Sequence, residues 1–428
     1  MKLGIIGAGA AGMTAAIFAR ELGADVTIIE RNDRPGKKLL ITGKGRCNVT
    51  NNSDVNTHIS NIPTNPRFMY AALNGFSASD TMNFFEDLGV PLKTERGNRV
   101  FPISDRAADV CGALKRRLDR LDVRLLHERA EHLIVDNSSV ESCCEKAIYN
   151  NEGKNHSTIV GVKTDAGKHD FDAVILATGG ASYPLTGATG DGYRMAAEVG
   201  HTIVPLKPAL VPVECEEKWA RELMGLSLKN VNLRVLDASA NEVFSEHGEL
   251  LFTHFGLSGP LVLSASSHMK KLPGMRYKMV IDLKPALEFQ MLDKRIQSDF
   301  SKYANKDFTN SLGDLLPTKL IAPIIRLSGI DERKKVNVIT REERHRLVTL
   351  LKELTLTAVK FRPIDEAIVT SGGVSVKEIS PKTMESKLVK GLYFAGEVID
   401  VDAYTGGFNL QIAFSTAHCA ATAVCTMI

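Results

Sequence analysis

The sequence is poor in cysteine, in long apolar runs and in charge of one sign. Its seven cysteines lack C-x-x-C spacing, which argues against a disulfide framework or a zinc site and favours a cytoplasmic protein. No run of about 18 apolar residues occurs, so we expect no membrane span. The 53 Lys and Arg residues nearly balance the 50 Asp and Glu residues, so we expect no nucleic-acid partner.

A catalytic side-chain pattern is also missing. The 428 residues contain no evident Ser-His-Asp arrangement, paired carboxylates or metal-ligand spacing, so no metal is expected. This does not exclude an enzyme, because a redox cofactor can carry the chemistry while the protein supplies orientation and electrostatics. The length exceeds what one hydrophobic core holds, so at least two domains are expected.

The first thirty residues contain the strongest motif. They read as a buried strand, the turn GAGAAG at 7–12, a helix and a second strand that ends at Glu30. In G-x-G-x-x-G, successive glycines permit a tight turn, let a diphosphate approach the backbone and let the helix pack closely on the strand. Free N–H groups at the helix start favour the diphosphate. The pattern predicts a dinucleotide whose ribose contacts Glu30, without a 2′-phosphate, since two negative charges would repel each other.

Three further segments favour FAD over NAD. The loop RPGKKLLITGKGRCNVTN (34–51) supplies glycines and cations that can follow a long extended ligand, and the buried strand in HDFDAVILATGG (169–180) ends in Thr-Gly-Gly. Segment 391–421 supplies a strand, a glycine turn, an acid and a helix start. No second G-x-G-x-x-G follows a later strand. We therefore expect no separate NAD(P)H domain, and NAD(P)H would serve only as a transient electron donor.

Together these motifs resemble the two-piece FAD domain of the glutathione-reductase-like flavoproteins. TGKGRCNVTN, FTHFGLSGP (252–260) and GEVIDVDAYTGGFNLQ resemble a narrower group, the BaiN/YhiN-like, aminoacetone-oxidase-like FAD-binding proteins. The resemblance extends from residue 7 to residue 411. It implies non-covalent FAD, with adenosine at Glu30 and Arg31, the diphosphate and ribityl chain at Gly396 and Glu397, and the isoalloxazine ring at 407–410.

The predicted cofactor residues combine the first turn with the positions that the resemblance implies. They are Gly7, Gly9, Ala10, Ala11, Gly12, Glu30, Arg31, Lys38, Arg46, Asn48, Ala130, Thr178, Gly179, Gly180, Gly396, Glu397, Gly407, Asn409 and Leu410. The helix that starts near Asn409 would direct N–H groups at the flavin and favour the negative charge that develops on its reduction.

The expected fold class is α/β, a discontinuous Rossmann-like FAD/NAD(P)-binding fold with an inserted β-rich and helical domain. Residues 1–190 and 346–428 would form the two parts of the FAD-binding domain, and 191–345 a β-barrel-like and helical substrate or cap domain. Alternating segments within 202–282 indicate antiparallel strands. Ser77 and TREE at 340–343 predict helix starts, and the polar segment 136–158 reads as a hairpin tip or an insertion.

Few side chains are candidates for catalysis. Tyr404 and His254 are candidate acids or bases, with packing on the ring edge and a structural role as their respective alternatives. Asp402 and Tyr183 have similar positions near the glycine turns. A charge on Arg46 would lower the pKa of Cys47, although structural packing is the default reading of that cysteine.

We expect an FAD-dependent oxidoreductase that exchanges a hydride between flavin N5 and a small organic substrate under the inserted domain. In a reductase mode NAD(P)H drives the reaction. In the alternative amine-oxidase mode, an aminoacetone-like substrate is oxidised and hydrogen peroxide forms. An RNA-modifying flavoprotein and a non-catalytic flavin carrier are further alternatives.

Overall fold

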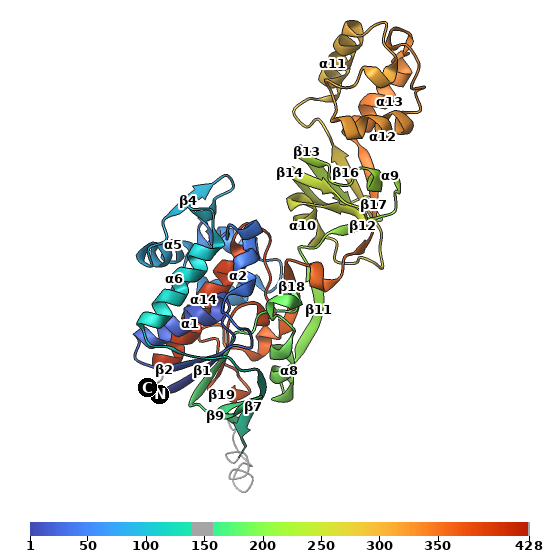
Figure 1. The fold of residues 1–428 in the computed structure, drawn as a ribbon. Coiled ribbons are helices and arrows are strands. Elements are labelled where there is room, and N and C mark those ends of the chain that lie inside the picture. The colour runs from blue at the N-terminus through green and yellow to red at the C-terminus, as the bar shows by residue number, and fades with distance from the viewer. Residues whose placement is uncertain (138–156, 427–428) are drawn as a thin grey trace. The chain divides into compact units, whose positions relative to one another are not determined.

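The computed structural model describes residues 1–137 and 157–426, and the chain forms two compact units (Figure 1). Unit 1 comprises residues 1–209 and 364–428, and unit 2 comprises residues 210–363. Most of the polar segment 136–158, predicted as a hairpin tip or an insertion, lies outside the described residues. No helix within those residues is both long and apolar enough to cross a bilayer.

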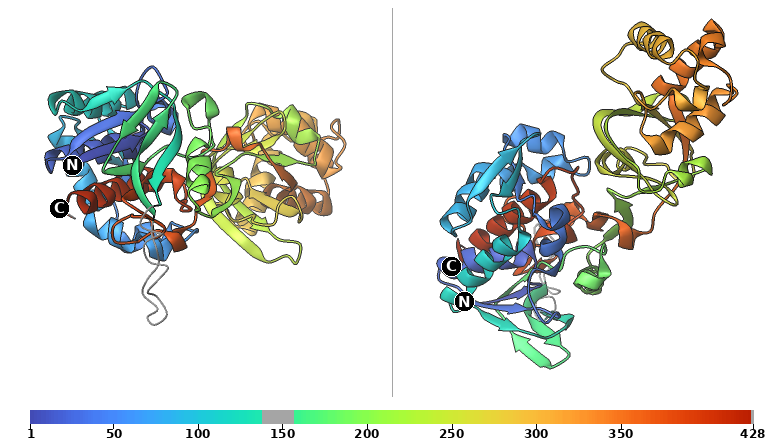
Figure 2. Two further views of the ribbon diagram at one scale, coloured as in Figure 1. Left: turned by 90° about the horizontal axis from the view of Figure 1, so that it is seen from below. Right: turned by 45° about the horizontal axis from the view of Figure 1, so that its top comes forward.

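Unit 1 is built on a parallel five-stranded sheet with the order β20-β10-β1-β2-β6. Its strands are β1 (Lys2–Ile6), β2 (Asp25–Ile29), β6 (Arg124–Leu126), β10 (Ala173–Leu176) and β20 (Leu392–Phe394). All residues of β10 and β20 are buried, as is typical of parallel strands covered on both faces. Helices α1 (Ala10–Glu21) and α14 (Phe408–Thr426) come from opposite ends of the chain and pack together (Figure 2).

Smaller elements complete unit 1. One sheet contains β7 (Ala130–Asp136), β8 (Ser157–Thr164), β9 (Gly167–Asp170) and β19 (Val389–Lys390), another contains β3 (Thr50–Asn51), β4 (Leu92–Glu95) and β5 (Arg99–Pro102), and β11 (Ile203–Ala209) pairs with β18 (Val369–Val374). The other helices are α2 (Lys37–Ile41), α3 (Val55–Ser60), α4 (Tyr70–Gly75), α5 (Ala78–Asp87), α6 (Ala107–Arg120) and α8 (Asp191–Glu198). Helix α5 begins at the N-cap predicted at Ser77, which also forms a capping box with Asp80.

Unit 2 contains a closed antiparallel barrel with the order β12-β15-β14-β13-β16-β17. These strands are β12 (Val213–Cys215), β13 (Ser227–Leu236), β14 (Glu242–Phe252), β15 (Gly256–Ser258), β16 (Tyr277–Asp282) and β17 (Leu354–Phe361). Its helices are α9 (Trp219–Glu222), α10 (Pro260–Ser266), α11 (Phe289–Lys302), α12 (Thr318–Ser328) and α13 (Arg341–Lys352). The capping box predicted at Thr340 opens α13, and the unit has its own apolar core.

The predicted fold class is confirmed, because a Rossmann-like unit in two chain pieces carries an inserted barrel and helices. The unit boundaries differ from the predicted 191 and 345. Residues 191–209 belong to unit 1, since α8 packs on β7 and β11 pairs with β18. Residues 346–363 belong to unit 2, since β17 closes the barrel by pairing with β12 and β16. Both differences come from pairing between distant segments, which local patterns do not reveal.

Candidate functional site

The turn between β1 and α1 has the geometry that the glycine motif requires. Gly7 adopts a φ of 101° and donates its N–H to Ile29 O at 2.8 Å. A Cβ atom on Gly12 would lie 1.8 Å from the carbonyl oxygen of Gly7, so a larger residue would push α1 away from the turn. A Cβ atom on Gly9 would meet no atom within 4 Å, which leaves the backbone there open to a ligand.

The first turn of α1 offers backbone donors to an anion. Gly9 is the N-cap residue and makes no side-chain cap, and the first turn contains no acidic residue. The first N–H groups of a helix, here those of Ala10 and Ala11, have no partner within the helix, and the positive end of the helix dipole favours negative charge. The open backbone at Gly9 and these donors fit the diphosphate of FAD.

Glu30 follows β2 directly and is held on both sides. It is 7% exposed, and its Oε2 accepts a 2.7 Å hydrogen bond from Ala8 N. Its Oε1 accepts hydrogen bonds from Asn32 N at 2.8 Å and Asn32 Nδ2 at 2.7 Å. Each carboxylate oxygen has further lone-pair positions, so the fixed carboxylate can still receive a ribose hydroxyl. Asn32, which the motif does not include, is thus a supporting residue that the sequence analysis missed.

Arg31 is bound to the start of α8. Its guanidinium donates to Thr189 Oγ1 at 2.7 Å and pairs with Asp191 at 2.9 Å. Arg129 pairs with the other carboxylate oxygen of Asp191 at 3.0 Å. Ala130, the next residue, is buried at the start of β7. The adenosine contact that the resemblance implies for Arg31, and the cofactor contact predicted for Ala130, stay predictions.

The loop after β10 packs closely against the C-terminal part of unit 1. A Cβ atom on Gly180 would lie 2.6 Å from Thr370 Oγ1 and 2.8 Å from Glu397 Oε1. Gly179 has a φ of 73°. The buried hydroxyl of Thr178 has no hydrogen-bond partner among the described residues. A buried hydroxyl without a partner is costly, so Thr178 fits a place where a polar ligand group completes the bonding.

Two predicted cofactor residues, Lys38 and Glu397, meet beside this loop. Lys38 Nζ donates to Glu397 Oε2 and to Ser182 Oγ, both at 2.7 Å. Glu397 Oε1 accepts a 2.9 Å hydrogen bond from Thr370 N. Ser182 and Thr370 were not predicted from the sequence. A signal existed for Thr370, since TSGG at 370–373 is similar to the Thr-Gly-Gly sequence at 178–180, but its spacing matches no dinucleotide motif.

Glycines let the C-terminal segments approach the rest of the site. Gly396 has a φ of 75°, and its Cβ position lies 2.9 Å from Ala11 Cβ at the start of α1. Gly407 has a φ of 102°, and its Cβ position lies 2.3 Å from the carbonyl carbon of Thr50. The helix α14 then begins at Phe408. Residues predicted from both ends of the chain are therefore brought together around α1 and α14.

The side chains of Asn409 and Asn48 have different surroundings. Asn409 Nδ2 donates to Ala403 O at 2.7 Å, and its Oδ1 accepts from Ala403 N at 2.9 Å. Its side chain thus fixes the loop before α14, next to the half-buried Leu410. Asn48 Oδ1 is buried and has no hydrogen-bond partner within the described segments. Of the two, only Asn48 has a side-chain acceptor without a protein partner in those segments.

Arg46 and Cys47 are engaged in structure. The Arg46 guanidinium pairs with Glu95 and Asp105 and lies 4.1 Å from the centroid of the Phe101 ring. Its hydrogen bond holds the pKa of Glu95 below the usual value. Cys47 is fully buried, and this burial raises the pKa of its thiol to about 12. The reactive-thiolate hypothesis for Cys47 is therefore wrong, because the thiolate is the reactive form.

The two candidate acids lie in different units. Tyr404 is half-buried in the loop before α14, and its N–H donates to Asn61 O at 3.0 Å. His254 is exposed in the turn between β14 and β15, and its ring centroid lies 4.9 Å from that of Phe255. The structural alternative for His254 stays open. Catalytic roles for Tyr404 and His254 stay predictions.

Two buried carboxyl groups precede Tyr404 in the same loop. Asp400 is 7% exposed and Asp402 is 4% exposed. Burial raises the pKa of Asp400 above its usual value, and the charge of Asp402 adds to the rise. Asn65 Nδ2 opposes it by donating to Asp400 Oδ2 at 2.9 Å. Asp400 is thus a buried carboxyl group that holds its proton more tightly than an aspartate in water.

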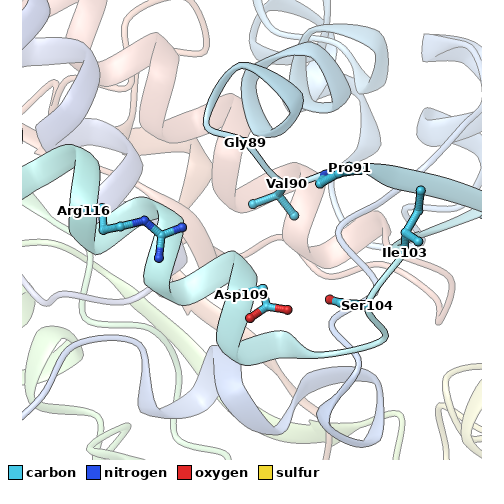
Figure 3. A pocket seen from close by; sticks show the side chains of 7 residues that line it. All are labelled: Gly89, Val90, Pro91, Ile103, Ser104, Asp109 and Arg116. Carbon is cyan, nitrogen blue, oxygen red and sulfur yellow. The ribbon is translucent and has the colours of Figure 1, made fainter.

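A surface hollow lies elsewhere on unit 1, between the end of α5, the segment after β5 and helix α6 (Figure 3). Its lining residues are Gly89, Val90, Pro91, Ile103, Ser104, Asp109 and Arg116. None of them is a predicted cofactor residue.

Known proteins match almost the whole chain. The family model described as HI0933-like protein Rossmann domain matches residues 1–423. The chain is 32% identical over 429 residues to a 3-dehydro-bile acid delta(4,6)-reductase of Clostridium scindens, which covers 99% of this chain and 98% of the relative. It is 31% identical over 422 residues to a ribosomal RNA dihydrouridine synthase of Haemophilus influenzae, which covers 98% of this chain and 97% of that relative.

Solved structures agree at the level of the fold. The 3-ketosteroid delta1-dehydrogenase from Sterolibacterium denitrificans, in complex with 1,4-androstadiene-3,17-dione, superposes with a TM-score of 0.53 at 14% identity and covers 100% of this chain and 99% of that chain. An identity this low supports the shared fold alone. With the first-turn geometry and the full-length matches, the chain is an FAD-dependent oxidoreductase and belongs to the HI0933-like family of Rossmann-domain proteins.

Proposed function

We propose that the protein binds FAD non-covalently and, with NAD(P)H as electron donor, reduces a C=C bond conjugated to a carbonyl group in a small organic substrate. The observation that carries this proposal is that the chain matches, over almost its whole length, relatives whose names denote such reductions, at 32% and 31% identity. The delta(4,6) double bonds of a 3-dehydro bile acid are conjugated to its 3-oxo group, and the C5=C6 bond of uracil is conjugated to a carbonyl. Both reactions therefore reduce the same type of bond, a C=C bond conjugated to a carbonyl group.

The residues of unit 1 would hold the cofactor in an extended form. The N–H groups at the start of α1 would bind the diphosphate, and Glu30 would bind the adenosine ribose. The first turn of α14, after Gly407, would place N–H groups beside the ring, where they favour negative charge. Bound FAD, once NAD(P)H has reduced it, would supply the hydride for the carbon β to the carbonyl.

The chain must also supply a proton to the carbon α to the carbonyl. Tyr404 is our first candidate donor, because it lies in the loop that Asn409 fixes before α14. His254 is the second, since its exposed ring is accessible to solvent and to a substrate. We also propose a cytoplasmic location. The five cysteines in the described segments are free thiols, as in other proteins of reducing compartments.

Uridine in ribosomal RNA is a second candidate substrate. It is favoured by two relatives at 31% identity, the synthases of Haemophilus influenzae and Escherichia coli. The near balance of 53 basic and 50 acidic residues gives little general attraction to phosphates. For this reason we place the small substrate first and RNA second.

Product analysis tests these alternatives. FAD-loaded protein is incubated without oxygen with NADH or NADPH and either a 3-oxo-delta(4,6) bile acid or ribosomal RNA, and the products are examined by mass spectrometry. The proposal expects two added hydrogens on the bile acid, whereas dihydrouridine in the RNA alone would favour the second candidate. Peroxide formation from aminoacetone and oxygen, with neither reduction, would instead indicate the amine oxidase.

A further inference from the structure

Lys38 and Glu397 form the centre of a compact polar cluster. The Lys38 ammonium contacts Glu397 Oε2 and Ser182 Oγ, both at 2.7 Å. Glu397 Oε1 accepts hydrogen bonds from Thr370 N at 2.9 Å and Ser182 Oγ at 3.4 Å. The side chains of Lys38 and Glu397 are only 25% and 20% exposed. Both oxygens of the carboxylate therefore have protein partners, and the cation is already neutralised.

The cluster joins four segments of unit 1 that are far apart in sequence. Lys38 lies in α2 and Ser182 follows the Thr-Gly-Gly loop, whereas Thr370 lies in β18 and Glu397 in the turn 396–398. The first two precede unit 2 in the chain and the last two follow it. Thr370 also accepts a hydrogen bond from Ala181 N at 2.9 Å through its hydroxyl. The cluster thus holds the two chain pieces of the FAD-binding unit together.

One member of the cluster adjoins a turn that the cofactor is expected to contact. Gly396, next to Glu397, packs against Ala11 at the start of α1, with its Cβ position 2.9 Å from Ala11 Cβ. Gly180 packs against Glu397 itself. Movement of the Glu397 carboxylate would therefore displace both glycine turns. A partly buried carboxylate without its cation is unfavourable, so such movement is expected when Lys38 is removed.

We propose that Lys38 is a positioning residue, whose ammonium fixes Glu397 and through it the Gly396 and Gly180 turns in the arrangement that receives FAD. The alternative is that Lys38 acts on a phosphate of the cofactor directly. The proposal rests on FAD binding by unit 1 and does not depend on which substrate is reduced. Its test measures the affinity for FAD and the stability of the FAD-free protein. The positioning role can therefore be refuted while the proposed reduction holds, and the proposed reduction can be refuted while the positioning role holds.

A double-mutant cycle separates the two roles. The variants are K38M, E397Q and K38M/E397Q in the full-length protein, with K37M as the control. Lys37 lies in the same helix and pairs with Asp33 at 2.7 Å, so its removal changes the charge equally without touching Glu397. For each variant the Kd for FAD and the Tm of the protein stripped of FAD are measured.

The positioning role predicts that K38M and E397Q each raise the Kd roughly tenfold and lower the Tm of the FAD-free protein by about 3 °C or more. It also predicts that the double variant has a Kd for FAD no higher, and a Tm no lower, than K38M, because no carboxylate is left unpaired. K37M should match the unchanged protein. If K38M does not fold, the double variant should still fold, and failure of both would overturn the proposal.

The alternative has a different signature. If Lys38 acts only on a phosphate, K38M leaves the Tm of the FAD-free protein unchanged and raises the Kd in a salt-dependent manner. In the double variant, the factors by which K38M and E397Q each raise the Kd should then multiply, because the two side chains act independently. Either result would overturn the positioning role.

Discussion

The N–H of Ala8 donates a 2.7 Å hydrogen bond to Glu30 Oε2, so the acid that follows β2 fixes the turn that follows β1. The same carboxylate accepts two hydrogen bonds from Asn32. The residue expected to recognise the ribose therefore also shapes the diphosphate-binding turn. Loss of its charge should disturb both.

Replacing Glu30 by glutamine should weaken FAD binding roughly tenfold, since hydrogen bonds to a charged group contribute about 1.5–3 kcal/mol each. Quenching of FAD fluorescence during titration measures the Kd. Glu21→Gln is the matched control, because Glu21 pairs with Arg117 at the surface, where ion pairs contribute about 0–1 kcal/mol. Unchanged FAD affinity in E30Q would contradict the role given to Glu30.

Two alanine substitutions in the glycine turn, at Gly12 and at Gly9, should have different effects on folding and on FAD binding. Gly12→Ala should lower the Tm of the FAD-free protein by roughly 3–10 °C, because its Cβ would lie 1.8 Å from Gly7 O. Gly9→Ala should leave that Tm unchanged, since its Cβ meets no atom within 4 Å. It should nevertheless raise the Kd for FAD, because the methyl group stands where the diphosphate approaches. Equal loss of Tm in both variants would argue against this division.

Features that depend on contacts between residues close in the sequence were predicted, and features that depend on contacts between distant segments were not. The turn at 7–12, Glu30 and the caps at Ser77 and Thr340 depend on neighbours within a few residues, and short patterns suffice to identify them. The region predicted as antiparallel strands is a closed barrel, but its boundaries depend on pairing of β17 with distant strands. Those boundaries were therefore misplaced.

Within the candidate site, the same distinction holds. The family resemblance implied Lys38 and Glu397 as cofactor residues. Their contact with each other joins segments from opposite ends of the chain, so the sequence did not predict it. The role of Arg46 likewise depends on Glu95 and Asp105, which come from another part of unit 1. Asn32, Ser182 and Thr370 act through other protein residues, so no motif for ligand contact identifies them.

Replacing Cys47 by alanine should leave the flavin redox reaction within about twofold of the unchanged protein. Burial raises the pKa of this thiol to about 12, so it is protonated at neutral pH. Stopped-flow measurement of flavin reduction and reoxidation provides the rates. A decrease of more than tenfold at unchanged FAD content would restore a redox role for Cys47.

Replacing Asp400 by asparagine should change the pH dependence of stability. The pKa of Asp400 is raised by burial and by Asp402 in the folded state. The folded state therefore holds the proton more tightly, and its stability declines as pH rises from the unfolded pKa of about 3.9 through the folded value. The Tm of D400N minus that of the unchanged protein should become more positive from pH 4 to pH 8.

The control for this measurement is Asp87→Asn at an exposed position of α5. A Tm difference for D400N that follows the difference for D87N over the same pH range would mean that Asp400 titrates alike in the folded and unfolded states.

The absorbance of bound flavin tests the central claim most directly. Without oxygen, NADH or NADPH should bleach the oxidised flavin band of the FAD-loaded protein, and a 3-oxo-delta(4,6) bile acid should then restore it. A protein that takes up no FAD, or a flavin that only an amine bleaches and only oxygen restores, would contradict the account.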